Sequence, residues 1–249
     1  ALSDVDTPED LATWAAARLA SRNVPPRVSV IIPTRNEQDH LAATLSSVLT
    51  AGDVEVIVVD GRSTDRTIEI ARQFGVSVIA SEPSRGVQLN AGAAHARSNV
   101  LLFLHADTLL PSDYLAAVRQ TLAHPDVSAG AFGLAIDARG VAPRLIEWGV
   151  NVRSRVFGRP YGDQALFMST HIFCDCNGFP NLPFMEDYFM LSRLKARGRI
   201  RITPQRVSTS ARRWKTSGWL RTTLAHQWMI VLSCSPKMSP SATVGFRAL

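Results

Sequence analysis

The stretch VSVIIPTRNE at residues 28–37 is an apolar run that ends abruptly in polar residues. Two later runs repeat this pattern, because residues 54–60 end at Asp60 and residues 100–107 end at Asp107. Helical segments are expected between and after them at 37–49, 65–74 and 86–97, with a short strand at 76–80. Strands that are apolar on both faces and alternate with helices are typical of a parallel sheet. The sequence therefore predicts an α/β fold with a mixed, mostly parallel central sheet and helices on both faces.

The second half of the chain is less regular. Its expected elements are strands at 130–136, 162–169 and 200–203 and helices at 184–197 and 218–232. The helix at 218–232 has apolar residues at helical spacing, which indicates core packing or a homodimer face rather than membrane-surface binding. The predicted organisation is an N-terminal helical extension at 1–26, one α/β domain at 27–215, and a C-terminal helix and tail at 216–249.

The composition is that of a folded protein without a membrane span. Hydrophobic residues make up 46% of the 249 residues, and no apolar run is long enough to cross a bilayer. The N-terminus lacks the basic start and apolar core of a signal peptide. Cys174, Cys176 and Cys234 are odd in number, which argues against a disulfide framework. We therefore expect buried thiols and a cytoplasmic location.

Positive charge gathers late in the chain. The formal net charge is +6, and many of the basic residues lie between 193 and 215. Such a run could bind nucleic acid, a membrane surface or an anionic substrate, or could form the solvated face of a helix and a strand. A basic nucleic-acid-binding protein is therefore one function class to consider. The chain has no recognisable nucleic-acid motif and no interleaved aromatic residues, so nucleic acid is not an expected partner.

Polar side chains follow three successive strands of the predicted sheet. The strand ends are PTRNE at 33–37, DGRS at 60–63 and HAD at 105–107. In open α/β sheets, ligands gather beyond the carboxyl ends of the strands. The first strand lacks the glycine-rich loop of a dinucleotide-binding domain and that of a P-loop NTPase. A nucleotidyltransferase also needs a glycine-rich, basic loop there, and PTRNE is not one.

Several segments in order resemble the glycosyltransferases of family 2. They are VSVIIPTRNE at 28–37, VIVVDGRSTDRT at 56–67, RGVQLNAG at 85–92, LHAD at 104–107, NGFP at 177–180 and MED at 185–187. The resemblance extends from residue 28 to about residue 215. It implies the GT-A nucleotide-diphospho-sugar transferase fold, a UDP-sugar donor, a divalent metal ion, and transfer with inversion at the anomeric carbon.

The donor site implied by this resemblance lies at the first strand ends. Asp60 can accept a hydrogen bond from the uracil N–H, and Glu37 can hold the nucleoside, although a carboxylate there also favours a helix start. Arg85 precedes a helix N-terminus, where a cation and backbone N–H groups suit a diphosphate. The residues expected to bind the donor are Pro33, Thr34, Asn36, Glu37, Asp60, Arg62, Arg85, Gln88, Asn90, His105 and Ala106.

The metal and catalytic residues are also implied by the resemblance. Asp107 matches the last aspartate of the family's metal-binding D-x-D element, while His105 replaces the first. One carboxylate, with phosphate oxygens and waters, can still hold Mg²⁺ or Mn²⁺. Asp187 matches the family's general base, with Glu186 beside it, although an acidic pair at a helix start can also act on the helix alone.

The acceptor is expected to meet two basic stretches of the second half. Its candidate contacts are Arg153, Arg159, Gln164, Arg212, Arg213 and Trp214. The HAD element, GDQ at 162–164, PFMED at 183–187 and SARRW at 210–214 resemble a short subgroup of family 2 associated with arsenosugars, which includes selenosugar synthases. That resemblance implies transfer from UDP-N-acetylglucosamine or UDP-glucose to selenophosphate, a small anion. Transfer to a hydroxyl of a small molecule or lipid is the alternative.

Overall fold

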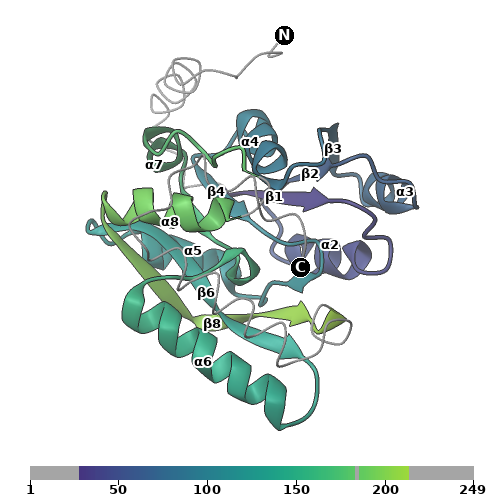
Figure 1. The fold of residues 1–249 in the computed structure, drawn as a ribbon. Helices are drawn as coiled ribbons and strands as arrows, with labels where there is room; N and C mark the ends of the chain where they lie inside the picture. Colours follow the sequence, from purple (N-terminus) through teal and green to yellow (C-terminus); the bar gives the residue numbers. More distant parts are fainter. Residues whose placement is uncertain (1–27, 183–184, 213–249) are drawn as a thin grey trace.

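The computed structural model describes residues 28–182 and 185–212. These residues form one eight-stranded sheet with the strand order β3-β2-β1-β4-β7-β6-β8-β5. Helices lie on both sides of this sheet (Figure 1). The predicted α/β architecture with a mixed central sheet is therefore confirmed. The N-terminal extension, Arg213, Trp214 and the predicted helix at 218–232 lie outside the described residues.

The first half of the sheet is parallel. Its elements are β1 (Val28–Thr34), α2 (Leu41–Leu49), β2 (Val54–Asp60), α3 (Thr67–Gln73), β3 (Ser77–Ala80), α4 (Arg85–His95) and β4 (Val100–Phe103). Strand β1 lies between β2 and β4, and its last residue, Thr34, is opposite Asp60. The apolar runs and the helices predicted in this half are confirmed, with boundaries that differ by a few residues.

The second half contains the elements that sequence patterns describe least well. They are β5 (Thr108–Leu109), α5 (Tyr114–Leu122), β6 (Val127–Asp137), α6 (Val141–Phe157), the 3₁₀ turn η1 (Gly162–Gln164), β7 (Phe167–Ser169), α7 (Thr170–Asp175), α8 (Glu186–Lys195) and β8 (Arg199–Ser210). The strand predicted at 162–169 is wrong in its first part, which forms η1. The patterns predict no helix at 141–157, yet these residues form α6, the longest helix in the described part of the chain.

Alternating side chains along the strands fill two layers of core. On β1, Val30 and Ile32 face one side and pack in a cluster with Leu45 of α2. Ile31 faces the other side and packs in a second cluster with Leu89 of α4. Because successive strand residues point to opposite faces, a continuous apolar strand requires cover on both faces. The helices on the two faces of the sheet provide this cover (Figure 1).

The cysteines of α7 are part of the interior. Cys174 and Cys176 are buried and are not joined in a disulfide, as the sequence predicts. Burial raises the pKa of the Cys176 thiol, which disfavours the nucleophilic thiolate. Across residues 28–182 and 185–212, none of the helices combines the length and the apolar character that crossing a membrane requires.

Candidate active site

The carboxyl ends of β1 and β2 hold Asp60 in a fixed orientation. Asp60 is buried, and its Oδ2 accepts a hydrogen bond from the N–H of Ser63 at 2.9 Å. The hydroxyl of Thr34 lies 3.4 Å from Asp60 Oδ1. The side-chain amide of Gln88 donates to the carbonyls of Thr34 and Val59 at 2.9 and 2.8 Å. Gln88 thus ties α4 to both strand ends, and Asp60 is held where the two strands end.

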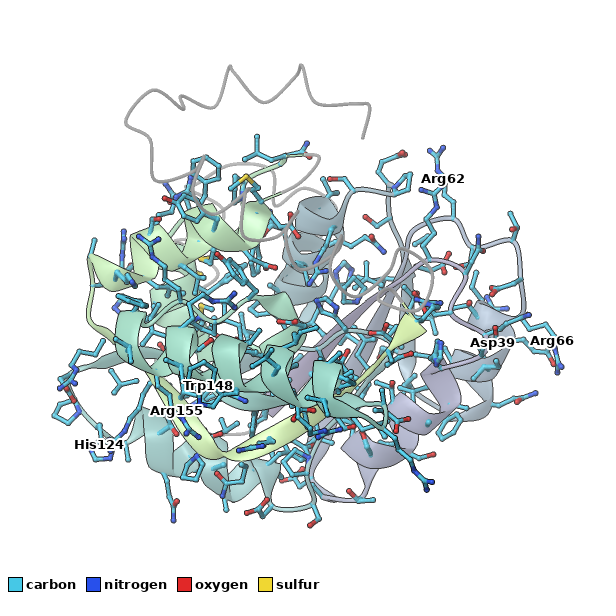
Figure 2. All side chains as sticks on the ribbon, turned by 60° about the horizontal axis from the view of Figure 1, so that its bottom comes forward. Asp39, Arg62, Arg66, His124, Trp148 and Arg155 are labelled. Atoms are coloured by element: carbon cyan, nitrogen blue, oxygen red, sulfur yellow. The ribbon has the colours of Figure 1, made fainter. Side chains whose placement is uncertain are left out.

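The loops that follow β1 and β2 are joined to each other. Asn36 and Arg62 adopt left-handed backbone conformations with φ of 56° and 63°, which are uncommon in residues other than glycine. The Asn36 side chain accepts from the N–H of Thr64 at 2.8 Å. Arg62 projects from the surface and pairs with Glu82 (Figure 2). Asn36 therefore shapes the loop beside Asp60, whereas Arg62 is oriented toward solvent.

A cluster of charged side chains connects the start of α4 to the start of α8. Arg85 Nε lies 3.0 Å from Glu186 Oε1, and Arg85 Nη2 lies 3.8 Å from Asp187 Oδ2. Arg85 Nη2 also contacts the ring of His105. Asp187 Oδ2 accepts a hydrogen bond from the N–H of Gly162 at 3.1 Å. The structure therefore brings together predicted residues from three separate motifs.

The two carboxylates of this cluster differ in environment. Burial raises the pKa of Glu186, the charge of Asp187 raises it further, and Arg85 lowers it. Met185, the residue before α8, has a left-handed φ of 67°, a strained conformation that sets the direction in which α8 begins. Glu186 is buried beside Arg85, while Asp187 is partly exposed. Asp187 is therefore the carboxylate that a bound molecule can reach.

Arg212 bridges two carboxylates from different motifs. Its Nη2 lies 2.8 Å from Glu37 Oε1 and 3.7 Å from Asp107 Oδ2. The end of β8 brings it there, because the N–H of Ser210 donates to the carbonyl of Asp107 at 3.0 Å. The sequence predicts Arg212 on the acceptor side. In the structure its guanidinium lies at the carboxylates predicted for donor and metal.

The segment 105–107 connects the two charged groups. Its middle residue, Ala106, is buried, and the Ala106 carbonyl accepts a hydrogen bond from the hydroxyl of Thr44 in α2 at 2.7 Å. His105 contacts Arg85 on one side, and Asp107 lies near Arg212 on the other. Three adjacent residues thus link the Asp187 cluster to the Glu37–Asp107 pair.

The carboxylates of Glu37 and Asp107 are suited to a cation. Both lie near one guanidinium nitrogen of Arg212, which acts here as a stand-in cation. Glu37 Oε2 is buried and has no hydrogen-bond partner among the described residues. Within the described residues, no group of three His, Cys, Asp or Glu side chains could enclose a metal ion by itself. Mg²⁺ commonly binds one or two carboxylates and completes its shell with waters and phosphate oxygens, so this pair fits an open metal site.

Two residues predicted to bind ligands use their polar groups within the protein. Asn90 exchanges two hydrogen bonds with the backbone of Phe179, at 2.8 and 2.9 Å. Gln164 is fully buried, accepts from Ser154 at 2.7 Å, and donates to a carbonyl of β6 at 2.9 Å. Pro33, also predicted to bind the donor, has no polar side-chain group and is partly buried within β1. Asn90 and Gln164 therefore position loops, and their side-chain contacts are with protein atoms.

Of the arginines predicted to bind an acceptor anion, the three in the described part of the chain have different partners. Arg153 stacks over the ring of Tyr161 at 4.3 Å, and burial lowers its pKa. Arg159 lies 5.9 Å from the ring centre of Tyr188. Arg212 lies at Glu37, as described above. Arg153 and Arg159 thus contact two tyrosines that line one cavity, whereas Arg212 lies apart from them at Glu37.

Lys195 is a candidate site residue that the sequence analysis does not single out. A small cavity is lined by Arg159, Tyr161, Tyr188, Leu191, Ser192 and Lys195. Burial lowers the pKa of Lys195, and the charge of Arg159 lowers it further, so the two cations are close. The spacing of Tyr188, Ser192 and Lys195 places them on one face of α8 and was readable in the sequence. Because Tyr188 directly follows Asp187, this cavity adjoins the charged cluster.

The described residues have the GT-A fold, with a mixed central sheet and helices on both sides. This chain belongs to Glycosyl transferase family 2, whose sequence profile matches residues 29–189.

Curated relatives share part of the chain. A PGL/p-HBAD biosynthesis glycosyltransferase of Mycobacterium bovis is 33% identical over 160 residues, which are 59% of this chain and 61% of the relative. A dolichyl-phosphate hexose transferase of Haloferax volcanii is 36% identical over 91 residues, which are 35% of this chain and 40% of the relative. The chain therefore spans about three fifths of the first relative and less of the second.

Solved structures share the fold at low sequence identity. TarS of S. aureus superposes with a TM-score of 0.60 at 19% identity, over 74% of this chain and 60% of that one. The mannosyltransferase PcManGT of Pyrobaculum calidifontis, solved with GDP-Man and Mn²⁺, has a TM-score of 0.60 at 24% identity, over 81% and 64% of the two chains. TarS has also been solved with UDP-GlcNAc. At these identities the likeness establishes the fold.

Proposed function

We propose that this chain is an inverting glycosyltransferase that moves a sugar from a UDP-sugar to a small acceptor. The observation that carries the proposal is the segment 105–107, which links a carboxylate suited to a cation, Asp107, to the cluster that orients Asp187. Such a reaction needs positive charge at a leaving diphosphate and, for a hydroxyl acceptor, a base. UDP-N-acetylglucosamine and UDP-glucose are the proposed donors.

The orientation of Asp60 supports uracil as the base of the donor. Its carboxylate is buried and is fixed by Thr34 and Ser63. A carboxylate accepts hydrogen bonds only, and uracil presents a ring N–H where cytosine and adenine present a ring acceptor. The structures similar in fold include one with UDP-GlcNAc and one with GDP-Man. Selectivity among nucleotides is therefore the property that tests this assignment.

A divalent cation held by Asp107, with Glu37 beside it, is part of the proposal. Mg²⁺ or Mn²⁺ would neutralise the charge that develops on the leaving diphosphate. The hydrogen bond to Glu37 raises the pKa of Arg212, so its guanidinium stays charged. Arg212 can then exchange its carboxylate partners for phosphate oxygens, for which a guanidinium is well suited.

Asp187 is the proposed base. The acceptor atom attacks the anomeric carbon on the face opposite the diphosphate, and its bond to that carbon forms as the bond to the diphosphate oxygen breaks. UDP leaves with the electron pair of that bond. Gly162 and Arg85 both engage Asp187 Oδ2, so the other oxygen, Oδ1, is the atom proposed to take the acceptor proton. Glu186 holds Arg85 in place.

Two acceptor classes are compatible with this arrangement. The neighbouring cations Arg159 and Lys195, beside Tyr188, favour a small anion such as selenophosphate, whose selenium is nucleophilic without a base. The oriented Asp187 favours a hydroxyl of a small molecule or lipid, which becomes a good nucleophile only when its proton is removed. A cytoplasmic location and a homodimer remain predictions.

Gly162 offers a test of how closely the cluster is packed. A Cβ at this position would clash with Arg85 Nη2 and Asp187 Oδ2. We expect Gly162→Ala to displace Asp187 and to lower kcat about 10²-fold, because small misplacements of catalytic groups have effects of that size. Gly149→Ala is the control, since its Cβ would lie in open space. A wild-type kcat in Gly162→Ala, measured on folded protein, would contradict the assigned packing.

Arg212→Ala removes the cation that Glu37 and Asp107 share. We expect Mn²⁺ to bind the nucleotide-free variant about two- to fivefold more tightly, because a partly exposed ion pair contributes up to ~1 kcal/mol. Calorimetric titration with Mn²⁺ measures this without turnover. Arg66→Ala, which removes an exposed pair with Glu69, is the control. Unchanged or weaker Mn²⁺ binding in Arg212→Ala would show that Arg212 does not compete with the metal.

The proposed function is tested by turnover with defined acceptors. UDP-N-acetylglucosamine and UDP-glucose are each incubated with Mn²⁺ and either selenophosphate or a panel of hydroxyl compounds, and products are followed by NMR. The proposal expects UDP release coupled to a product of inverted anomeric configuration. A product of retained configuration, or no product from any UDP-sugar, would refute it. Product from only one acceptor class identifies that class.

A further inference from the structure

Helix α6 has its polar face turned inward. Its buried residues include Glu147, Asn151 and Ser154. Glu147 Oε1 accepts from the N–H of Ile136 at 2.6 Å. Asn151 accepts from the N–H of Leu134 at 2.8 Å and donates to its carbonyl at 2.9 Å. Strand β7 pairs with β6 only at Ala129 and Gly130, so α6 completes the edge of β6 beyond that point with polar side chains.

The outward face of α6 is apolar. Val141, Leu145, Trp148, Val152 and Val156 repeat every three or four residues, which aligns them on one side of a helix. These side chains, here called the apolar stripe, are between 38% and 83% exposed. Among the described residues, six of the eight exposed large hydrophobics lie on α6, the five of the stripe and Phe157. Such a concentration of exposed apolar surface marks an interaction site.

A basic pocket adjoins the apolar stripe. Its volume is about 480 Å³, and it is lined by His124, Asp126, Val127, Arg155, Arg199, Ile200, Arg201 and Ile202. This pocket is here called the arginine pocket, after Arg155, Arg199 and Arg201. One carboxylate, Asp126, also lines it, and Asp126 Oδ2 lies 3.6 Å from Arg199 Nη1. Arg155 extends from α6 itself, between stripe residues Val152 and Val156. Figure 2 shows Trp148, Arg155 and His124 along the same side of the molecule.

We propose that the apolar stripe and the arginine pocket together bind an anionic phospholipid surface. Valine, leucine and tryptophan side chains can enter the boundary between headgroups and acyl chains. Arginines beside them can bind headgroup phosphates, each basic residue near such a surface being worth about 1 kcal/mol. The apolar stripe is complementary to the acyl-chain boundary, and the arginine pocket is complementary to the headgroup phosphates. One lipid surface can therefore bind both features.

Charge distinguishes this partner from the C-terminal segment and from a second copy of the chain. Residues 213–249 contain no Asp or Glu, so that segment could cover the apolar stripe but could bring no carboxylate to the arginine pocket. A second copy of the chain would add to a formal net charge that is already +6. A phospholipid surface supplies both apolar area and negative charge.

Docking through α6 would also orient the candidate active site relative to the lipid surface. Helix α6 ends at Phe157, whose carbonyl accepts a hydrogen bond from Lys195 of α8. Gly162, which holds Asp187, follows five residues later. The lipid surface would therefore adjoin the segment that leads to Asp187, whichever acceptor the enzyme uses.

Vesicle flotation of the full chain, without donor or acceptor, tests the proposal. We expect binding to vesicles of phosphatidylcholine mixed with phosphatidylglycerol, little binding to phosphatidylcholine alone, and weakening by salt. Leu145→Ser with Trp148→Ser should reduce binding at least about tenfold. Arg199→Gln with Arg201→Gln should reduce it by a similar factor. The controls are Leu49→Ser, another exposed leucine, and Arg66→Gln, at the opposite end of the molecule (Figure 2).

Several outcomes would overturn the proposal. One is no binding to anionic vesicles, and another is binding that the stripe variants leave unchanged. A dimer in light scattering that Leu145→Ser dissociates, with no vesicle binding, would assign the stripe to a second copy. Melting temperatures measured without ligand show whether each variant is folded. Flotation requires no turnover, so a failure to bind vesicles would leave the proposed glycosyl transfer untouched. Likewise, a failure of glycosyl transfer would leave the proposed lipid binding untouched.

Discussion

Asp187→Asn is expected to lower kcat for a hydroxyl acceptor by about 10²–10⁴-fold, the range for loss of a general base. Asparagine keeps the shape of the side chain and can still accept the hydrogen bond from Gly162 at the position of Oδ2. It cannot take a proton from the acceptor. With selenophosphate the same variant should lose little activity, because selenium in that anion is already a nucleophile. Steady-state rates with both acceptors measure the difference.

The matched control for this prediction is Asp175→Asn. Asp175 is an exposed carboxylate at the end of α7 that pairs with His171 at 3.4 Å. Its rates should equal those of the wild type. Unchanged turnover of a hydroxyl acceptor by Asp187→Asn would exclude Asp187 as the base. Loss of activity with selenophosphate as well would indicate that Asp187 binds rather than deprotonates the acceptor.

Asp107→Asn is expected to remove metal-dependent turnover with either acceptor. The amide has no negative charge, so Asp107 can no longer attract a cation beside Glu37 and Arg212. We expect kcat/KM to fall at least about 10³-fold, equivalent to ~4 kcal/mol of transition-state stabilisation. Turnover in the presence of increasing Mn²⁺ measures both the rate and the apparent metal affinity.

Metal removal provides the independent check on Asp107. Wild-type enzyme treated with EDTA should lose activity and regain it with Mg²⁺ or Mn²⁺. Asp107→Asn should show neither the loss nor the recovery above its low residual rate. Full activity of the wild type in EDTA would refute the metal site, and wild-type rates in Asp107→Asn would refute the assignment of Asp107.

The first half of the fold and several of its site residues follow from the sequence for a simple physical reason. Parallel strands buried on both faces appear as uninterrupted apolar runs, and each run ends where a polar side chain can face a ligand. Asp60 is the last residue of β2, and Asp107 follows the end of β4 by four residues, so both are recognisable at the ends of apolar runs. Glu186 and Asp187 were recognisable as an acidic pair at a helix start, although their sharing of Arg85 was not.

The remaining features depend on contacts that local patterns do not encode. Arg212 reaches Glu37 because β8 returns beside β5, a pairing between segments far apart in sequence. Helix α6 was missed because its buried side, with Glu147 and Asn151, is polar, and its exposed side is apolar. That arrangement reverses the usual rule for a surface helix. Gln164 was assigned to an acceptor because burial of its amide cannot be read from neighbouring residues.

The most direct test of the account is a melting-temperature panel of UDP, GDP, ADP and CDP, each with and without Mn²⁺. A ligand that binds the folded state raises the melting temperature, and at equal concentrations the ligand that binds more tightly gives the larger shift. The account predicts the largest shift with UDP, an increase of that shift with Mn²⁺, and loss of the preference for UDP in Asp60→Ala. Equal shifts for all four nucleotides, or no shift with any of them, would contradict it.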